Sequence, residues 1–377
     1  VEALSLKIWK EVLGEEEISF ADNFFELGGD SIKAVQIVSR LFDHGIAIKV
    51  KDILTYHTID QLSLYADIQN ASRWYNQEKI EGKRRLTPIE QWFFGWKFPQ
   101  PGYYNQSALF EVKGNVSVGL LREAFKLLVQ HHDTLRINFS KDVSEAFYND
   151  AYPEPRLAEI DTDRISETCI IETCTKMKSQ FNIASSLLFN IAVIKENNDV
   201  KLLFITAHHL VMDGVSWRIL LEDLYTIYGA LKRKDVIRLP HKTASLLDWV
   251  RCIDEYRQSG RLAAQENYWH NTEKTVFRIP QDFETNEWRV KDLNTLSGFL
   301  GREETDFLVK DSHRVYKTNV HILLNVALAV ALKEWTGHTA FVVEQENHGR
   351  LLEDIDLSRT LGWFTALYPV KLELKGT

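Results

Sequence analysis

The apolar residues of this chain change their spacing near residue 85, and this change constrains the fold more than any other feature. Before it, Leu4, Ile8 and Val12 recur at helical spacing, and Gly14 predicts the end of that helix. Further helical segments follow, the last over residues 59–68. Beyond residue 85, strand-like runs alternate with amphipathic helices. The sequence therefore predicts a small all-α bundle followed by a larger α/β domain.

The stretch between the two predicted domains is polar and has no sustained apolar periodicity. It covers residues 71–85 and ends in the densest basic cluster of the chain, Lys83, Arg84 and Arg85. We interpret it as a solvated linker. The predicted domains are then residues 1–70 and 86–377, and a chain of 377 residues is long enough for two or three folded units.

The second domain is expected to contain a mixed sheet and several helices. Strands are predicted at 200–207 and 339–344, and helices at 118–129, 215–231 and 321–335.

Composition excludes several classes of protein. The net charge of -8 disfavours nucleic acid as a partner, and no apolar run approaches the length that spans a membrane. The three cysteines lack CxxC spacing, which disfavours disulfides and structural zinc. A basic segment followed by an apolar one, the pattern of a secretion signal, is not found, so secretion is not expected. We expect a cytoplasmic monomer without metal or membrane partner.

A glycine-rich turn precedes the second helix of the bundle. Gly28 and Gly29 allow a tight turn, and Ser31 follows at the start of the helix. One interpretation is a helix cap, since Asp30 and Ser31 are favoured capping types. The other is an exposed hydroxyl that is modified with a phosphodiester, which the positive end of a helix favours.

The residues around Ser31 resemble a known family. The stretch DNFFELGGDSIKAVQIVSRL is similar to the peptidyl carrier domains of nonribosomal peptide synthetases, which are four-helix bundles. The resemblance implies that Ser31 carries 4′-phosphopantetheine, attached by a phosphopantetheinyl transferase. Carriers more often have His at the position of Asp30, and the GGDS form resembles carriers that precede an epimerization domain.

A second candidate site lies where the strand at 200–207 ends. It contains His208 and His209, and a short loop then reaches Asp213 and Gly214. Neighbouring residues of an extended chain point to opposite sides, so one histidine is expected to face a cavity and the other to be held in the structure. Imidazole exchanges protons near neutral pH. Asp213 could act as a base, but it lies before a glycine turn, and we interpret it as part of a buried salt bridge that holds the loop.

Metal binding by this pair of histidines is not favoured, because the helical HExxH spacing is absent. The other pair, His131 and His132, ends a predicted helix, and we interpret it as structural.

The pattern HHxxxDG resembles the condensation and epimerization superfamily, whose two-lobed α/β fold is like that of chloramphenicol acetyltransferase. The resemblance makes His209 catalytic, with His208 and Gly214 as structural support of the site. Three segments resemble the epimerization branch: LTPIEQWFF, YNQS and DGVSWRILLEDL.

A third candidate site follows the strand predicted at 339–344. Glu346 and Arg350 can be read as a surface ion pair. The segment ENHGR nevertheless resembles the epimerization motif EGHGRE, with Asn347 in place of the usual Gly, and LGWFTALYPV resembles the next motif. The resemblance makes Glu346 the second catalytic group and Arg350 a partner of Asp213 that bridges the two lobes. Epimerization domains continue with a further motif, so we expect the second lobe to be incomplete here.

Together these resemblances imply an isomerase of antibiotic biosynthesis, a carrier–epimerization didomain that inverts an aminoacyl or peptidyl thioester from L to D at Cα. An upstream adenylation domain and a downstream condensation domain are the expected partners. One alternative is a condensation domain, which forms a peptide bond between carrier-bound substrates. Another is a catalytically inactive module that only docks the carrier.

Overall fold

The structure is a computed structural model of the chain. It describes residues 1–46, 48–65, 75–150, 152, 155–274, 279–283, 289, 292–316, 318–350, 352 and 355–375. The chain divides into two compact units. One unit contains Val1–Ser72, Gly260–Glu346 and Leu367–Thr377, and the other contains Arg73–Ser259 and Asn347–Ala366.

The N-terminal part of the first unit is a helical bundle, as predicted. Its helices are α1 (Glu2–Leu13), α2 (Ser31–Asp43), α3 (Val50–Thr55) and α4 (Ile59–Ser63). Gly14 ends α1 with a φ of 75°, a left-handed conformation that glycine adopts readily. Trp9 and Phe24 meet edge to face at 5.3 Å in the core of this bundle. The predicted last helix extended to residue 68, and its residues 66–68 lie outside the described ones.

The remainder of the first unit is built on a two-stranded sheet of β8 and β9. Its elements are α10 (Glu266–Glu273), α11 (Arg302–Asp306), a π-helical turn (Phe307–Asp311), α12 (Ser312–Tyr316), α13 (Val320–Thr336), β8 (Ala340–Asn347) and β9 (Ala366–Glu373). Phe341 of β8 packs on Ala329 and Leu332 of α13. The predicted helix at 321–335 and strand at 339–344 are therefore confirmed.

The second unit holds a four-stranded mixed sheet in the order β2-β7-β6-β5. Its strands are β2 (Asn105–Glu111), β5 (Leu157–Thr162), β6 (Phe189–Glu196) and β7 (Asp199–His208). The pairs β2–β7 and β6–β7 are antiparallel, and β5–β6 is parallel. The predicted strand at 200–207 corresponds to β7.

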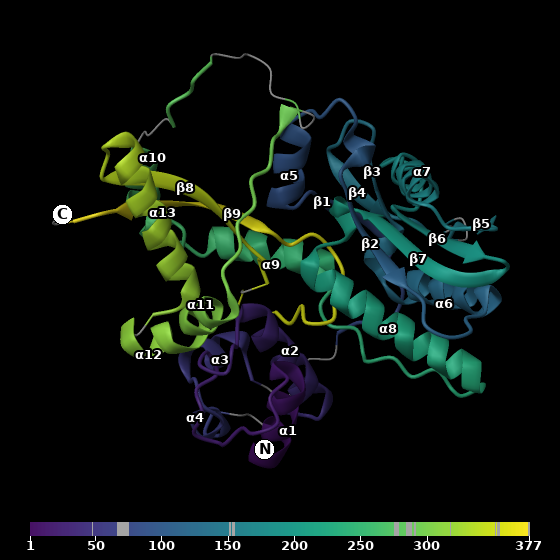
Figure 1. The fold of residues 1–377 in the computed structure, drawn as a ribbon, viewed down its shortest axis with the longest axis horizontal. Coiled ribbons are helices and arrows are strands. Elements are labelled where there is room, and N and C mark those ends of the chain that lie inside the picture. Colours follow the sequence, from purple (N-terminus) through teal and green to yellow (C-terminus); the bar gives the residue numbers. More distant parts are fainter. Residues whose placement is uncertain are drawn as a thin grey trace. The chain divides into compact units, whose positions relative to one another are not determined.

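Helices cover both faces of this sheet (Figure 1), which explains why six consecutive residues of β6 are buried. The helices involved are α6 (Val118–His131), α7 (Glu167–Lys178) and α8 (Gly214–Arg233). Met177 of α7 packs on Ala192 and Phe204 on one face. Phe125 of α6 meets Phe189 at 5.7 Å on the other, and α8 lies beside α6. The helices predicted at 118–129 and 215–231 are confirmed.

Part of the predicted linker forms a strand of a smaller antiparallel sheet. Its strands are β1 (Gly82–Arg85), β3 (Ile137–Phe139) and β4 (Glu145–Tyr148). The second unit also contains α5 (Pro88–Gly95), α9 (Leu246–Gln258) and short 3-10 turns at Pro101–Tyr103 and Asp133–Arg136, and the first unit has a further 3-10 turn at Ala263–Gln265. Residues 82–85 are therefore a strand rather than solvated linker, while residues 71–74 lie outside the described ones. Arg84 is buried, and its charge is balanced by Glu90, whose two carboxylate oxygens accept from the guanidinium group at 2.6 and 2.7 Å. No helix of the described residues is long and apolar enough to cross a membrane.

Candidate functional site

The turn before α2 explains how the predicted attachment serine is presented. Asp30 caps the helix, because its Oδ1 accepts the backbone N–H groups of Ile32 and Lys33, both at 2.8 Å. The sequence allowed either Asp30 or Ser31 to cap the helix, and in the structure Asp30 is the capping residue. A Cβ on Gly29 would lie 2.5 Å from the Phe24 carbonyl oxygen, so this turn requires glycine.

Ser31 is the first residue of α2, and its side chain lies outside the described part of the chain. The residues on either side of it, Asp30 and Ile32, are exposed, and a 13-residue helix follows. An exposed helix N-terminus favours a phosphodiester. These surroundings fit a phosphopantetheine arm, and the role of Ser31 itself stays a prediction.

His208 is completely buried at the end of β7. Its Nε2 donates to the carbonyl oxygen of Pro101 at 2.7 Å, and its Nδ1 accepts the N–H of Leu210 at 3.1 Å. Burial lowers the pKa of His208 to about 4. The side chain is therefore neutral at neutral pH and held by both nitrogens, which suits the supporting role predicted for it.

His209 has a different environment from its neighbour. It begins a 3-10 turn, η3 (His209–Val211), so the chain is no longer extended at this residue. Its backbone N–H donates to Tyr104 at 2.9 Å, and its Nδ1 lies 2.8 Å from the Met212 carbonyl oxygen. The half-buried ring packs on Trp363 at 4.3 Å between ring centres and on Tyr104 at 5.5 Å.

Three residues that contact this site or its partners were not identified from the sequence. Gln106 of β2 places its amide nitrogen 3.0 Å from Nε2 of His209, and Trp217 of α8 donates to Gln106 at 2.9 Å. Trp363 supplies the ring beside His209. Gln106 lies in the YNQS segment and Trp217 in DGVSW, but no spacing rule connects positions that meet only because β2 pairs with β7.

Asp213 and Arg350 form the ion pair that the sequence predicted. The Arg350 NH2 group donates to both oxygens of Asp213 at 2.9 Å, and both side chains are buried. Asp213 also caps α8 by accepting the N–H of Ser216 at 2.8 Å. Arg350 further donates to the carbonyl oxygens of Leu357 and Thr360. The pair therefore anchors the loop that follows His209.

Two interpretations of Arg350 do not hold in the structure. It does not form a surface ion pair with Glu346, because its side chain is 1% exposed and bound to Asp213. It does not bridge two lobes, because Asn347–Ala366 belongs to the same compact unit as Asp213. The chain turns back onto the start of α8 directly after β8, which sequence spacing does not reveal.

Two glycines near this ion pair differ in what they require. A Cβ on Gly349 would lie 1.7 Å from the carbonyl oxygen of Phe364, and φ is +67°, so only glycine fits there. A Cβ on Gly214 would meet no described atom within 4 Å. Packing against the described residues therefore does not demand glycine at position 214, and its supporting role stays a prediction.

Glu346 lies inside β8, not after the strand as the sequence suggested, and it is exposed. The preceding Gln345 reaches back to α13, where its Oε1 lies 3.0 Å from His321 Nε2. Side chains alternate along a strand, so Glu346 points away from α13. Glu346 and His209 belong to different compact units, and their convergence on one substrate stays a prediction.

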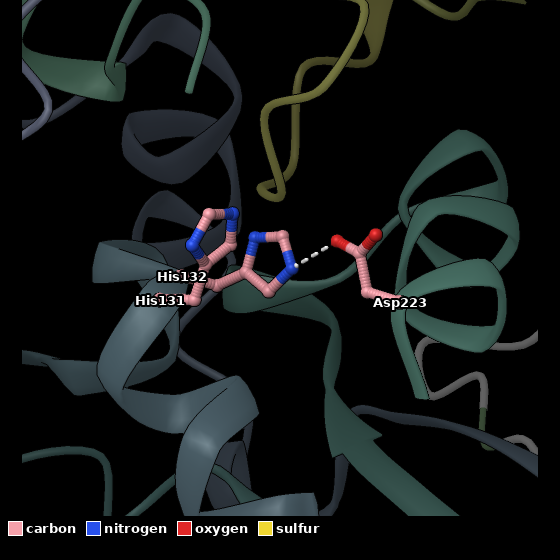
Figure 2. Close-up of side chains that lie close together, drawn as sticks. All are labelled: His131, His132 and Asp223. Carbon is pink, nitrogen blue, oxygen red and sulfur yellow. Dashed lines mark hydrogen bonds and ion pairs between the residues drawn. The ribbon is translucent and has the colours of Figure 1, made fainter. Parts of the chain in front are cut away.

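The second histidine pair belongs to a polar cluster between α6 and α8. Figure 2 shows the ring of His132 facing Asp223, with His131 on the other side of His132. One ligand-type atom of each of the three residues lies within 4.8 Å of the others. His132 Nε2 lies 2.8 Å from Asp223, whose other oxygen binds Arg359. Burial lowers the pKa of His131 to about 4. A metal ion would compete with Arg359 for Asp223, so the arrangement favours a structural link between the helices.

Two family models match the chain. The phosphopantetheine attachment site matches residues 6–66, and the condensation domain matches residues 80–377. Among curated relatives, gramicidin S synthase 1 of Brevibacillus brevis is 35% identical over 100% of this chain and 35% of its own length. Tyrocidine synthase 2 of Brevibacillus parabrevis is 36% identical, over 100% of this chain and 11% of its own length. The chain thus spans about a third or less of these relatives.

Solved structures share the fold of the larger domain. The epimerization domain from the third module of tyrocidine synthetase B is 34% identical, with a TM-score of 0.75 over 80% of this chain and 71% of that one. The first condensation domain of the calcium-dependent antibiotic synthetase has a TM-score of 0.61 at 19% identity, over 78% and 69%. The chain therefore belongs to the nonribosomal peptide synthetases, as a phosphopantetheine carrier domain followed by a condensation-type α/β domain.

Proposed function

We propose that this chain inverts an aminoacyl or peptidyl group from L to D at Cα while the group is held as a thioester on the arm of Ser31. The observation that carries the proposal is the likeness to the epimerization domain of tyrocidine synthetase B. The geometry of His209 supports it, because Nδ1 donates to the Met212 carbonyl and leaves Nε2 as the basic nitrogen.

Inversion requires that a proton leaves one face of Cα and that another arrives at the opposite face. The arm supplies a thioester carbonyl, which accepts the negative charge that develops at Cα. His209 exchanges the proton on one face through Nε2, and Glu346 exchanges it on the other. Glu346 is exposed on its strand and therefore open to a substrate.

The residues around His209 keep its position fixed during this exchange. The Asp213–Arg350 pair anchors the loop after it, and His208 fills the space behind it as a neutral side chain. In the proposed module, an adenylation domain upstream selects the amino acid and a transferase installs the arm. A condensation domain downstream receives the product.

Peptide-bond formation is the second candidate, because the family model over residues 80–377 is that of the condensation domain. Such a domain also uses His209, but it joins two carrier-bound groups and needs no carboxylate at Glu346. A module that docks the carrier and catalyses no reaction is the third candidate.

Hydrogen exchange at Cα separates the three candidates. The arm is loaded with an L-aminoacyl pantetheine, the chain is incubated in D2O, and the chirality and deuterium content of the released amino acid are measured. An epimerase yields D-amino acid that carries deuterium at Cα. Retention of the L form without deuterium would contradict the proposal, and amide formation with a second loaded carrier would then identify condensation.

Variants assign the roles of individual residues in the same assay. His209→Ala is expected to lower the exchange rate by about 10²–10⁴-fold, the usual size of a general acid–base contribution. Ser31→Ala is the control for delivery, since it should prevent loading while the fold remains. A His209→Ala chain that exchanges at nearly the normal rate rejects the assignment of His209.

A further inference from the structure

Gln106 connects the candidate base to helix α8 through its side-chain amide. The indole Nε1 of Trp217 donates to Oε1 of Gln106 at 2.9 Å, and Nε2 of Gln106 lies 3.0 Å from Nε2 of His209. On the other side of the imidazole, Nδ1 lies 2.8 Å from the Met212 carbonyl oxygen. The three contacts form one continuous run from Trp217 to Met212.

The partners at the two ends determine every donor and acceptor in this run. An indole nitrogen can only donate, so the oxygen of the Gln106 amide faces Trp217 and its NH2 group faces His209. A carbonyl oxygen can only accept, so Nδ1 of His209 carries the proton given to Met212. The imidazole is therefore neutral, and the lone pair on Nε2 accepts from Gln106.

Regular secondary structure holds Gln106 in this position. Its backbone lies in β2 opposite Ala207 of β7, and its carbonyl oxygen accepts from the hydroxyl of Thr206 at 3.3 Å. Trp217 lies in the first turn of α8, which Asp213 caps. The amide is thus aimed by elements on both sides of the His209 loop.

Other ionisable groups near the ring have contacts of their own. Tyr104, from the segment before β2, stacks on the ring at 5.5 Å. His208 is neutral at neutral pH because burial lowers its pKa to about 4. Asp213, in the loop after His209, is bound to Arg350. Gln106 is a side-chain donor at Nε2 of His209, at 3.0 Å.

We infer that Gln106, oriented by Trp217, is a positioning residue that holds His209 in its neutral, Nδ1-protonated form by donating to the lone pair on Nε2, and that it releases this lone pair before His209 takes a proton from the substrate. When Nε2 takes a proton, it faces the NH2 group as a second donor, so the amide opposes the charged form. While it faces Nε2, Gln106 therefore disfavours imidazolium, and it favours the return of the proton after transfer. The inference concerns the same site as the proposed epimerization and rests on it for its catalytic meaning.

The protonation of His209 can be measured without turnover. The chain is labelled with ¹⁵N-histidine, and the signal of His209 among the 12 histidines is identified by its loss in His209→Gln. The wild-type signal should report a neutral ring protonated at Nδ1. Gln106→Glu places a carboxylate beside Nε2 and should raise the titration midpoint by about 1–2 pH units, because an opposite charge favours imidazolium. Gln106→Leu should raise it by less, and Trp217→Phe should resemble Gln106→Leu.

Gln91→Glu is the matched control, because Gln91 is exposed on α5 and its amide donates to Leu86 instead. This variant makes the same charge change and should leave the His209 midpoint within a few tenths of a pH unit of wild type. A wild-type ring protonated at Nε2, or equal midpoints in Gln106→Glu and Gln91→Glu, would overturn the inference.

Deuterium exchange on the loaded chain gives a second readout. In Gln106→Glu the acidic limb of the exchange rate should move to higher pH by the same amount as the NMR midpoint, because the base is lost as imidazolium. If the loaded wild-type chain exchanges nothing, the proposed epimerization fails while the NMR titration still decides the role of Gln106. If the pH profile of the exchange rate does not shift while the NMR midpoint of His209 does, the proposed role of Gln106 in catalysis is overturned.

Discussion

His208 and His209 are adjacent in the chain, yet the fold gives the two rings different surroundings. His208 is buried against Pro101 and Leu210, and its lowered pKa follows from the cost of placing a charge away from water. His209 is half-buried, with Gln106 at its basic nitrogen. Residue type alone does not distinguish the two, and the difference lies in which polar groups the strands and loops bring to each ring.

The lowered pKa of His208 predicts how stability depends on pH. An unfolded histidine binds a proton near pH 6.5, whereas the folded His208 does so near 4. Between these values the unfolded chain holds the extra proton, so the free energy of unfolding falls as pH drops from about 6.5 to about 4, by at most about 1.4 kcal/mol per pH unit. His208→Gln should flatten this slope in urea unfolding followed by tryptophan fluorescence.

Variants of two other histidines serve as the positive and the negative control for that measurement. His131→Gln should also flatten the slope, since burial lowers the pKa of His131 to about 4 as well. His270→Gln should change nothing, because this side chain is exposed on α10. A His208→Gln chain with the wild-type slope would show that His208 is not the proton-linked group.

At the scale of elements, α5 and β1 are joined by a buried ion pair. Glu90 accepts the N–H of Thr87 at 2.7 Å as part of a capping box and binds Arg84 of β1. Phe93, one turn further along α5, meets the ring of His208 at 5.6 Å. The ion pair therefore holds in place a helix that packs directly behind the His208 ring.

Loss of this pair should destabilise the second unit strongly. Glu90→Gln leaves Arg84 buried without its counter-charge and should lower the free energy of unfolding by about 3–5 kcal/mol. The control is Glu145→Gln, which breaks the exposed Lys83–Glu145 pair on the same sheet and should cost at most about 1 kcal/mol. Urea unfolding of both variants checks this, and equal losses would contradict the role of burial.

At the scale of the whole molecule, the carrier bundle has a core of its own. The buried apolar residues that form it lie between Ile8 and Leu62, and Trp9 and Phe24 at its centre are fully buried. A domain whose core comes from its own helices does not depend on the rest of the chain to bury it. The bundle and the α/β domain should therefore fold as separate domains.

The excised fragment of residues 1–75 tests this separation. It should unfold cooperatively on heating and gain the mass of one phosphopantetheine when treated with a transferase and coenzyme A. Ser31→Ala should keep the thermal transition and lose the mass gain. Trp9→Ala, which removes a fully buried ring at a cost of about 3–5 kcal/mol, should abolish the transition. A fragment that is unfolded without the α/β domain would refute the prediction.

Much of this protein follows from local patterns in its sequence. Periodicity located α6, α8, α13, β7 and β8 to within a few residues, and Gly14 marked the end of α1. These features were readable because a helix or strand, its caps and its apolar face involve residues that are close in the chain. The motifs around Ser31 and His209 likewise indicated the carrier and condensation-type domains.

Other features depend on residues that meet only after folding. Arg84 was predicted to be a charged residue of a solvated linker, but it lies in strand β1 and forms a buried ion pair with Glu90. Arg350 reaches Asp213 across 137 positions, and Gln106 reaches His209 across 103. Burial and the choice of hydrogen-bond partner arise when separate elements pack together, and they decide charge and basicity here. Residue spacing therefore indicated where the candidate site of this chain lies, while contacts between distant segments determined which groups meet each nitrogen of His209.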